Sequence, residues 1–124
     1  MKTNNFKHSC KARGYDAAKV LPDVSNMPAH MQDALTATAE MMINAEAINE
    51  GWTPADAETF WYPVFDLEKT PDNPSGFRFW RANLGYVDAY APGSSALYKT
   101  RESAIHAGTA FLETYRRIML PVKK

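Results

Sequence analysis

The sequence PAHMQDALTATAEMMINAEAINEG occupies residues 28–51 and decides the fold. Pro28 suits the first turn of a helix, where a missing N–H costs nothing, and Ser25 or Asn26 can supply the cap. Gly51 is a typical helix stop. One apolar stripe recurs at alternating three- and four-residue steps, at Met31, Leu35, Thr38, Met42, Ala45 and Ile48. We therefore predict a long amphipathic helix over residues 28–51 whose stripe faces a partner surface.

Two further helices are expected. Thr100 is a good N-cap, and the residues from Arg101 to about Met119 carry an apolar stripe with the helical period. Gly108 interrupts that helix at a cost of about 1 kcal/mol relative to alanine, which suggests that another backbone approaches closely there. Residues 6–13 read FKHSCKAR before a glycine and predict a short N-terminal helix.

The residues between the two main helices have the composition of strands. Residues 60–68 read FWYPVFDLE, and Pro63 restricts this segment to an edge strand or a bulge. Turn formers crowd into residues 70–76, and FRFWR at residues 77–81 then alternates with a period of two. The two segments therefore predict an antiparallel hairpin.

The order of elements predicts one α+β domain. Its predicted parts are a short helix and connector over 1–27, the long helix over 28–51, a three- or four-stranded antiparallel sheet over 60–99 with short strands at 86–90 and 95–99, and a C-terminal helix over 101–119. Two main helices packed on one face of such a sheet would bury both of their stripes at once. A length of 124 residues is typical of a single domain.

The composition excludes several classes of protein. Apolar residues make up 45% of the chain and charged residues 23%, which argues against a disordered or fibrous protein. The single cysteine, Cys10, allows no intrachain disulfide, so a reducing compartment is expected. The N-terminus lacks the apolar core of a signal peptide, and no apolar run approaches the roughly 18 residues of a membrane span. We expect a cytoplasmic protein with no membrane partner.

Charges are segregated along a chain whose formal net charge is zero. Residues 1–22 carry five basic side chains and one acidic, residues 23–75 carry ten acidic and one basic, and residues 76–124 carry eight basic and three acidic. The basic and acidic segments are expected to neutralise one another in the folded chain. A functional basic face is the alternative.

Four segments also carry a resemblance to a known group of proteins. They are CKARGYDAAK with LPDVS within residues 10–25, AEAINEGWTP at 45–54, PSGFRF at 74–79, and KTRESA at 99–104 followed by Ala107 and Gly108. Together they resemble a group of small uncharacterised proteins of Bacteroides-type gut bacteria that occur in phage-like or mobile-element contexts. Because the group has no assigned activity, the resemblance implies a shared fold and a genomic context, and it implies no reaction or site.

Residues with metal or nucleophile chemistry do not form a recognisable motif. The ligand-type residues His8, Cys10, His30 and His106 lack the spacing of a zinc site. Cys10 lies on the apolar side of its short helix and is interpreted as a small packing residue. We predict no metal-binding or cofactor-binding residue and no cofactor.

Acyl-transfer and acid–base motifs are weak as well. Ser94 and Ser95 follow a glycine, but in a Pro-Gly-Ser-Ser run that is ordinary turn composition. The acidic pairs Glu46/Glu50 and Asp56/Glu58 are interpreted as a solvated helix surface and a loop. We predict no catalytic residue and expect a protein that is not an enzyme.

Aromatic residues are the most suggestive feature. They crowd between residues 52 and 98, which is more than two or three helices can cover. If Phe77 and Phe79 face the helices, Trp80 points to the opposite face of the sheet, with Tyr62 across the hairpin and Arg78 at its flank. The candidate interaction surface is therefore Tyr62, Arg78 and Trp80. The alternative is that loops and the N-terminal segment cover this second face.

Two functions follow from this surface. The first is a small protein-interaction module, phage-related by resemblance, that binds itself as a homodimer or binds another protein through the aromatic sheet face. The second is a nucleic-acid-binding accessory protein, because the element order from Pro28 to Met119 resembles that of the double-stranded RNA-binding domain. Only a few basic residues, such as Lys99 and Arg101, open the last helix, and a net charge of zero supplies little electrostatic affinity for phosphates.

Overall fold

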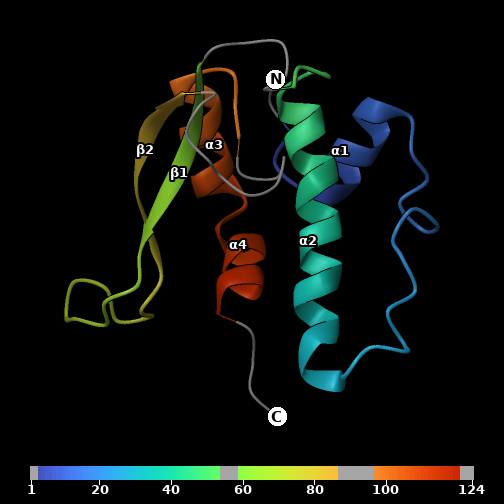
Figure 1. Cartoon of the computed structure of the whole chain (residues 1–124), viewed down its shortest axis with the longest axis horizontal. Coiled ribbons are helices and arrows are strands. Elements are labelled where there is room, and N and C mark those ends of the chain that lie inside the picture. The colour runs from blue at the N-terminus through green and yellow to red at the C-terminus, as the bar shows by residue number, and fades with distance from the viewer. Residues whose placement is uncertain (1–2, 54–58, 87–96, 121–124) are drawn as a thin grey trace.

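Figure 1 shows the computed structural model, which describes residues 3–53, 59–86 and 97–120. Its elements are α1 (Phe6–Arg13), α2 (Ala29–Ile48), β1 (Thr59–Asp66), β2 (Arg78–Tyr86), α3 (Arg101–Ala110) and α4 (Leu112–Met119). The predicted α+β class is confirmed, as is the antiparallel pairing of β1 with β2.

The sheet has two strands in the part of the chain that the structure describes, and not the three or four that we predicted. Most of the predicted strand over residues 86–90 lies outside the described residues. From the predicted strand over 95–99, Tyr98 makes only a single antiparallel bridge to Trp61. The sheet is therefore a narrow ribbon with one bridging residue on the far side of β1.

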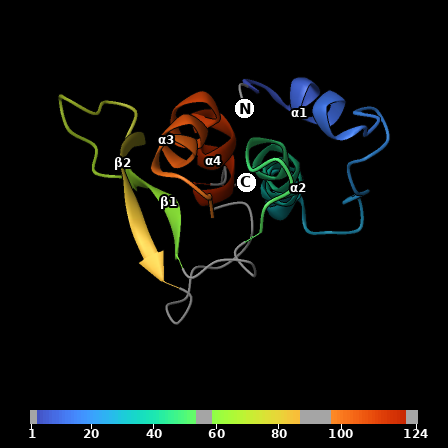
Figure 2. The same cartoon turned by 90° about the horizontal axis from the view of Figure 1, so that it is seen from above.

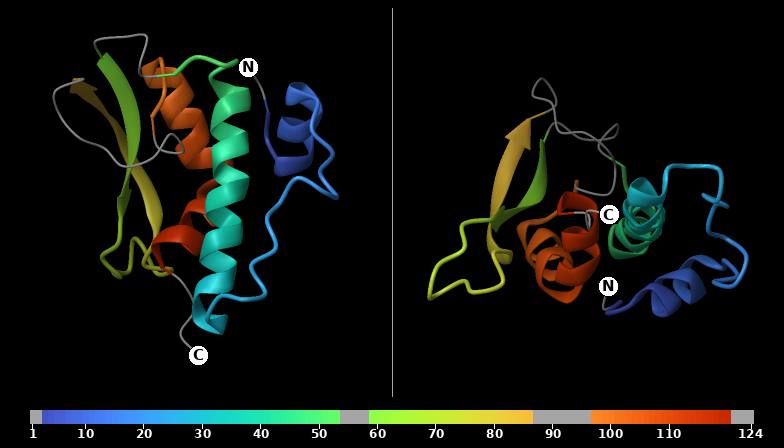
Figure 3. Two further views of the ribbon diagram at one scale, coloured as in Figure 1. Left: turned by 45° about the vertical axis from the view of Figure 1, so that its right-hand side comes forward. Right: turned by 90° about the horizontal axis from the view of Figure 1, so that it is seen from below.

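The narrowness of the sheet changes how the helices pack. We predicted two main helices side by side on one face, but α3 alone lies directly on both strands, while α2 packs mainly on α4 and α1 packs on α2. Figures 1, 2 and 3 show this order of layers from the sheet to α3 and α4, then α2, then α1. Two strands about 5 Å apart cover roughly the diameter of one helix, so a second helix has no room beside the first.

The predicted C-terminal helix over residues 101–119 is in fact two helices. Thr100 caps α3 by accepting a hydrogen bond from the Ser103 N–H (3.0 Å), as predicted. The helix breaks at Phe111, whose φ of −112° and ψ of 28° are not helical. The break directs α3 toward the sheet and α4 toward α2, while Phe111 is buried in the core.

The long helix is shorter than predicted at its C-terminal end. α2 ends at Ile48, because Glu50 and Gly51 both adopt positive φ values of 52° and 85°. At its start, Pro28 is the N-cap residue and no side chain caps the helix, so the predicted caps are wrong. Ser25 is instead held in a turn in which its N–H donates to Asp23 Oδ1 (2.9 Å).

The buried face of α2 also differs from the predicted stripe. Ala45 and Ile48 are buried, but Met31, Leu35 and Met42 are 43%, 37% and 51% exposed. The buried face consists of Ala37, Met41, Asn44, Ala45, Ala47 and Ile48. Because α2 lies between α1 and α4, small side chains allow close packing there, whereas periodicity alone gives most weight to the large ones.

The core lies between the sheet and the helices. Phe65 stacks on Phe77 with ring centroids 4.8 Å apart and also contacts Phe79 and Tyr115, so both Phe77 and Phe79 face the helices as predicted. The Tyr98 and Tyr115 hydroxyl groups are 2.7 Å apart in the buried centre. Burial is the largest cause that raises the pKa of each phenol, so both stay neutral.

Ion pairs join the basic C-terminal segment to the acidic long helix. Arg117 of α4 donates from Nη2 to Asp33 (2.8 Å) and from Nη1 to Glu40 (3.1 Å), both on α2. Arg13 lies 3.5 Å from Glu46 at the other face of α2. These contacts are those expected if the charged segments neutralise one another.

Candidate interaction surface

The two faces of the sheet are set by the pairing of its strands. A methyl group added at Gly108 of α3 would overlap the Phe79 ring and lie 3.1 Å from Pro63 Cβ, which places Phe79 and Pro63 on the helix side. Residues directly opposite one another share a face, and the faces alternate along each strand. Tyr62 with Asn83 and Val64 with Arg81 therefore lie on the outer face, away from the helices.

Trp80 lies at an irregularity in β2. Val64 pairs with Arg81 and Phe65 pairs with Phe79, so Trp80 is the extra residue of a β-bulge. The Trp80 side chain is 59% exposed, and the Arg81 guanidinium carbon lies 4.4 Å from the centroid of its ring. The bulge thus presents an indole stacked on a cation.

Arg78 is held within the chain. It contacts Asp66 of β1 at 2.9 Å and donates a second hydrogen bond to the Asp72 carbonyl oxygen at 3.0 Å. The Glu68 N–H and the Arg78 guanidinium lower the pKa of Asp66 from its ordinary value. The cation stacked on Trp80 is therefore Arg81, whereas Arg78 has a carboxylate and a carbonyl partner of its own.

Tyr62 is on the outer face but is not opposite Trp80. The register places Asn83 across from Tyr62, because the bulge shifts β2 by one residue. Tyr62 is half-buried beside Phe60, with ring centroids 6.2 Å apart, and the Phe60 ring covers Gly85. Tyr62 and Trp80 are therefore separate parts of one face.

Two exposed residues on β2 were missed in the sequence. Leu84 is 41% exposed and Tyr86 is 55% exposed, and both follow Trp80 on the same strand. β2 forms the outer margin of the sheet in Figure 2. The signal in the sequence was the continued alternation of large side chains after residue 81, which the short predicted strand did not include. By the same alternation, Leu84 and Tyr86 lie opposite Trp61 and Thr59 on the helix side of the strand, whereas Trp80 is on the outer face. We call these three exposed side chains of the edge strand, Trp80, Leu84 and Tyr86, the β2 surface.

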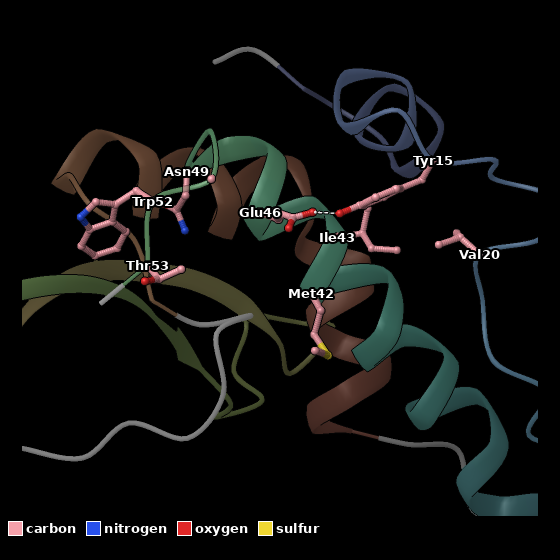
Figure 4. A pocket seen from close by; sticks show the side chains of 9 residues that line it. Tyr15, Val20, Met42, Ile43, Glu46, Asn49, Trp52 and Thr53 are labelled. Atoms are coloured by element: carbon pink, nitrogen blue, oxygen red, sulfur yellow. Dashed lines mark hydrogen bonds between the residues drawn. The ribbon is translucent and has the colours of Figure 1, made fainter. Parts of the chain in front are cut away.

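A groove lies beside α2 on the other side of the molecule. It has a volume of about 380 Å³ and is lined by Tyr15, Val20, Met42, Ile43, Glu46, Asn49, Gly51, Trp52 and Thr53. Figure 4 shows Tyr15 and Glu46 joined across it, with the Tyr15 hydroxyl donating to the Glu46 carboxylate (2.5 Å). Glu46 therefore has both Tyr15 and Arg13 as partners at this groove.

A second cavity of about 550 Å³ adjoins this groove at the end of α2. Asn49 lines this cavity, and its side chain is hydrogen bonded within the chain. Its Nδ2 donates to the Leu97 carbonyl oxygen (2.9 Å) and its Oδ1 accepts from the Lys99 N–H (3.2 Å). The side chain of Asn49 therefore ties the turn after α2 to the segment before α3. We therefore interpret both cavities as part of the junction between the end of α2 and the segment before α3, rather than as catalytic sites.

The cysteine and histidine side chains that could bind a metal or act as a nucleophile do not form a cluster among the described residues. Cys10 is a free thiol, 1% exposed, and burial is the main cause that raises its pKa, which disfavours a thiolate. His8 and His30 are exposed, whereas His106 donates from Nε2 to the Thr3 carbonyl oxygen (2.6 Å) and ties the N-terminal segment to α3. Within residues 3–53, 59–86 and 97–120, no three metal-ligand side chains lie together.

No helix in the described part of the chain is long and apolar enough to cross a membrane. Comparison with protein-family models, curated proteins and solved structures finds no match to this chain. The case for a function therefore depends on the geometry of its own residues.

Proposed function

We propose that the chain is a small non-enzymatic protein-interaction module whose contact surface is the β2 surface. The observation that carries the proposal is the exposure of three large side chains on one strand, of which Trp80 and Tyr86 are more than half exposed. Exposed tryptophan and tyrosine residues dominate the binding energy of many protein interfaces. Arg81 stacked on Trp80 adds a cation of the kind enriched at such interfaces.

The neighbouring outer face of the sheet supports the same proposal. Tyr62 and the Arg78–Asp66 ion pair border the bulge, so the candidate surface continues from the strand edge onto the sheet. Arg78 has its own carboxylate partner and is expected to contribute to the rim of an interface rather than to its energy. Trp80 is therefore the largest exposed ring of the candidate surface.

The test uses Trp80→Ala, which removes the largest exposed ring. The full-length chain is immobilised, proteins captured from a cell extract are cross-linked and identified, and the wild type is compared with Trp80→Ala. We expect one or more specific partner proteins whose affinity falls at least about tenfold in the variant.

The matched control is Trp52→Ala, a half-buried tryptophan of the groove on the other side of the molecule. It should retain the captured proteins if the β2 surface is the contact. The same captured set for the wild type and for Trp80→Ala, or loss with Trp52→Ala alone, would contradict the proposal. Circular dichroism spectra would verify that each variant is folded.

A second candidate is single-stranded nucleic-acid binding, and the Trp80–Arg81 stack is the observation that favours it. An exposed indole beside a guanidinium offers a base both a stacking surface and a nearby positive charge. A gel shift with single- and double-stranded probes at low and high salt tests this function. The absence of a shift at low salt would end it.

The proposal also includes a cellular location and a genomic context. We place the protein in the cytoplasm, since its one thiol is buried and unpaired, and in a phage-related or mobile-element context, as the resemblance implies. Neighbouring genes that encode no phage or mobile-element functions would contradict the proposed context.

A further inference from the structure

We infer that a second copy of this chain binds the Leu84 and Tyr86 end of the β2 surface, by antiparallel pairing of β2 with β2 about a two-fold axis at Leu84. This inference rests on the proposed function and names its partner. It would produce a continuous four-stranded sheet in the order β1-β2-β2-β1, with the helices of both copies on the same side.

The hydrogen bonds of β1 fix which groups of β2 point outward. The Trp61 N–H and carbonyl both bond to Tyr98 (2.7 Å each), on the side of β1 away from β2. In an antiparallel ladder, successive residues direct their N–H and carbonyl groups to opposite sides. The neighbours of Trp61 on β1 therefore bond to β2, and Leu84, which lies opposite Trp61, must direct its own groups away from β1.

The same alternation applies along the rest of β2. Asn83 and Gly85 bond to β1, whereas Ala82, Leu84 and Tyr86 direct their N–H and carbonyl groups to the outer edge. Among the described residues these outer groups have no backbone partner, because β2 is the last strand of the sheet. An unpaired strand edge is a template for another strand.

The bulge limits pairing to one part of this edge. It disturbs β2 at Trp80 and leaves residues 82–86 regular. Bulges and charged side chains commonly protect a strand edge from pairing with another strand. Arg78 and Arg81 lie on either side of the bulge, so the charges and the bulge protect the same end of β2. Residues 82–86 carry no charge and are thus the open portion of the edge.

Residues 82–86 are complementary to themselves. With the axis at Leu84, the exposed Leu84 side chain meets Leu84 of the second copy, the large Tyr86 ring meets the small Ala82, and Asn83 meets Gly85. Each pair shares a face of the sheet, and the two Arg81 side chains are kept at opposite ends. Two-fold homodimers are the commonest closed assemblies, and an isologous contact requires this kind of self-complementarity.

The test exploits the axis, because a side chain on it faces its own copy. Leu84→Lys and Leu84→Glu are each measured alone and as an equimolar mixture, by light scattering coupled to size-exclusion chromatography over a range of concentrations. We expect a wild-type dimer that dissociates on dilution, since a short edge contact is a small interface. Each variant alone should be monomeric, with self-association weakened at least tenfold, and the mixture should recover the dimer.

A monomeric wild type at millimolar concentration would overturn the inference. A dimer that persists in Leu84→Lys would overturn it too, because the contact would lie elsewhere, and failure of the mixture to recover would exclude the axis at Leu84. Tyr62→Lys, on the outer face but off the edge, is the control and should remain dimeric. Trp80-dependent capture of another protein by a monomeric chain would preserve the proposed function and reject only the second copy.

Discussion

Gly108 is the point at which α3 comes closest to the sheet. A Cβ atom at this position would overlap the Phe79 ring and crowd Pro63. In an exposed helix, glycine is about 1 kcal/mol less favourable than alanine, so the close approach outweighs a helix-propensity cost. The absence of a side chain at one residue thus sets the distance between two layers.

We expect Gly108→Ala to lower the free energy of unfolding by about 1–3 kcal/mol, since the steric overlap exceeds the gain in helix propensity. Urea unfolding followed by circular dichroism measures the change. Gly108→Ala combined with Phe79→Leu should be less destabilised than the two single changes predict, because the smaller side chain leaves room for the methyl group. Stabilisation by Gly108→Ala alone would show that the layers are not in contact there.

At the residue scale, local chemistry was readable from the sequence where one side chain acts on its own neighbourhood. The Thr100 cap was predicted and is confirmed. At Gly108 we predicted the close approach of another backbone, and the structure instead places the side chains of Phe79 and Pro63 there. The partners of Trp80 and Tyr62 were not predicted, because the bulge shifts the register by one residue. A bulge has no strong signature in a sequence that lacks glycine at that position.

At the scale of elements, α4 is attached to α2 by one arginine between two carboxylates. Arg117 hydrogen bonds lower the pKa of Asp33 from its ordinary value. A carboxylate with a lowered pKa in the folded chain adds stability that is present above its unfolded pKa of about 3.9 and is lost as pH falls through the folded pKa. This contact therefore weakens in acid.

We expect Asp33→Asn to lower the free energy of unfolding at pH 7 by about 0.2–1 kcal/mol, because Asp33 is largely exposed. The difference between variant and wild type should shrink when urea unfolding is repeated below pH 4. Asp72→Asn is the matched control, since only the backbone oxygen of Asp72 is bound by Arg78. An undiminished effect of Asp33→Asn in acid would exclude the ionised carboxylate as its cause.

The sequence predicted where most of the elements lie, but it did not predict where one helix breaks or which side chains of α2 are buried. The approximate positions of α1, α2 and the hairpin were predicted from glycine stops, turn formers and periodicity, and the start of α3 from the Thr100 cap. The break at Phe111 could not be predicted, because the period of apolar residues continues through it. The two resulting helices, α3 and α4, face different layers. The burial of Ala37 and the exposure of Met31 were equally hidden, since packing distance decides both.

At the scale of the whole molecule, Tyr98 and Tyr115 connect the sheet to the last helix. Tyr98 bridges β1 through its backbone and meets the Tyr115 hydroxyl of α4 through its side chain. Both pKa values are raised above the ordinary value of 10.0, mainly by burial. Groups with raised pKa values add stability that is present below the unfolded pKa and is lost as pH rises toward the folded one.

We therefore expect the free energy of unfolding to fall as pH rises above about 10, and this fall to be smaller in the Tyr98→Phe and Tyr115→Phe double variant. Urea unfolding between pH 8 and 11 measures it. At pH 7, each single change should cost about 0.5–1.5 kcal/mol for the lost hydrogen bond. An equal alkaline loss in the double variant would assign the effect to other groups.

The predicted arrangement of layers depended on the number of strands, and the described residues form two rather than the three or four that we predicted. A wider sheet would have accepted both main helices, whereas two strands accept one. The candidate surface was predicted in kind, as exposed aromatic residues on the hairpin, but its strand edge was not, because an edge exists only once the strands have been counted.

Residues 101–119 form α3 and α4, which lie between the sheet and α2 but come after both of them in the sequence. During synthesis, the hairpin and α2 leave the ribosome before residues 101–119 are available to separate them. We therefore expect the nascent chain to expose the rings of the hairpin and the methyl groups of α2 until translation of these residues is complete, and to depend on chaperones for that interval.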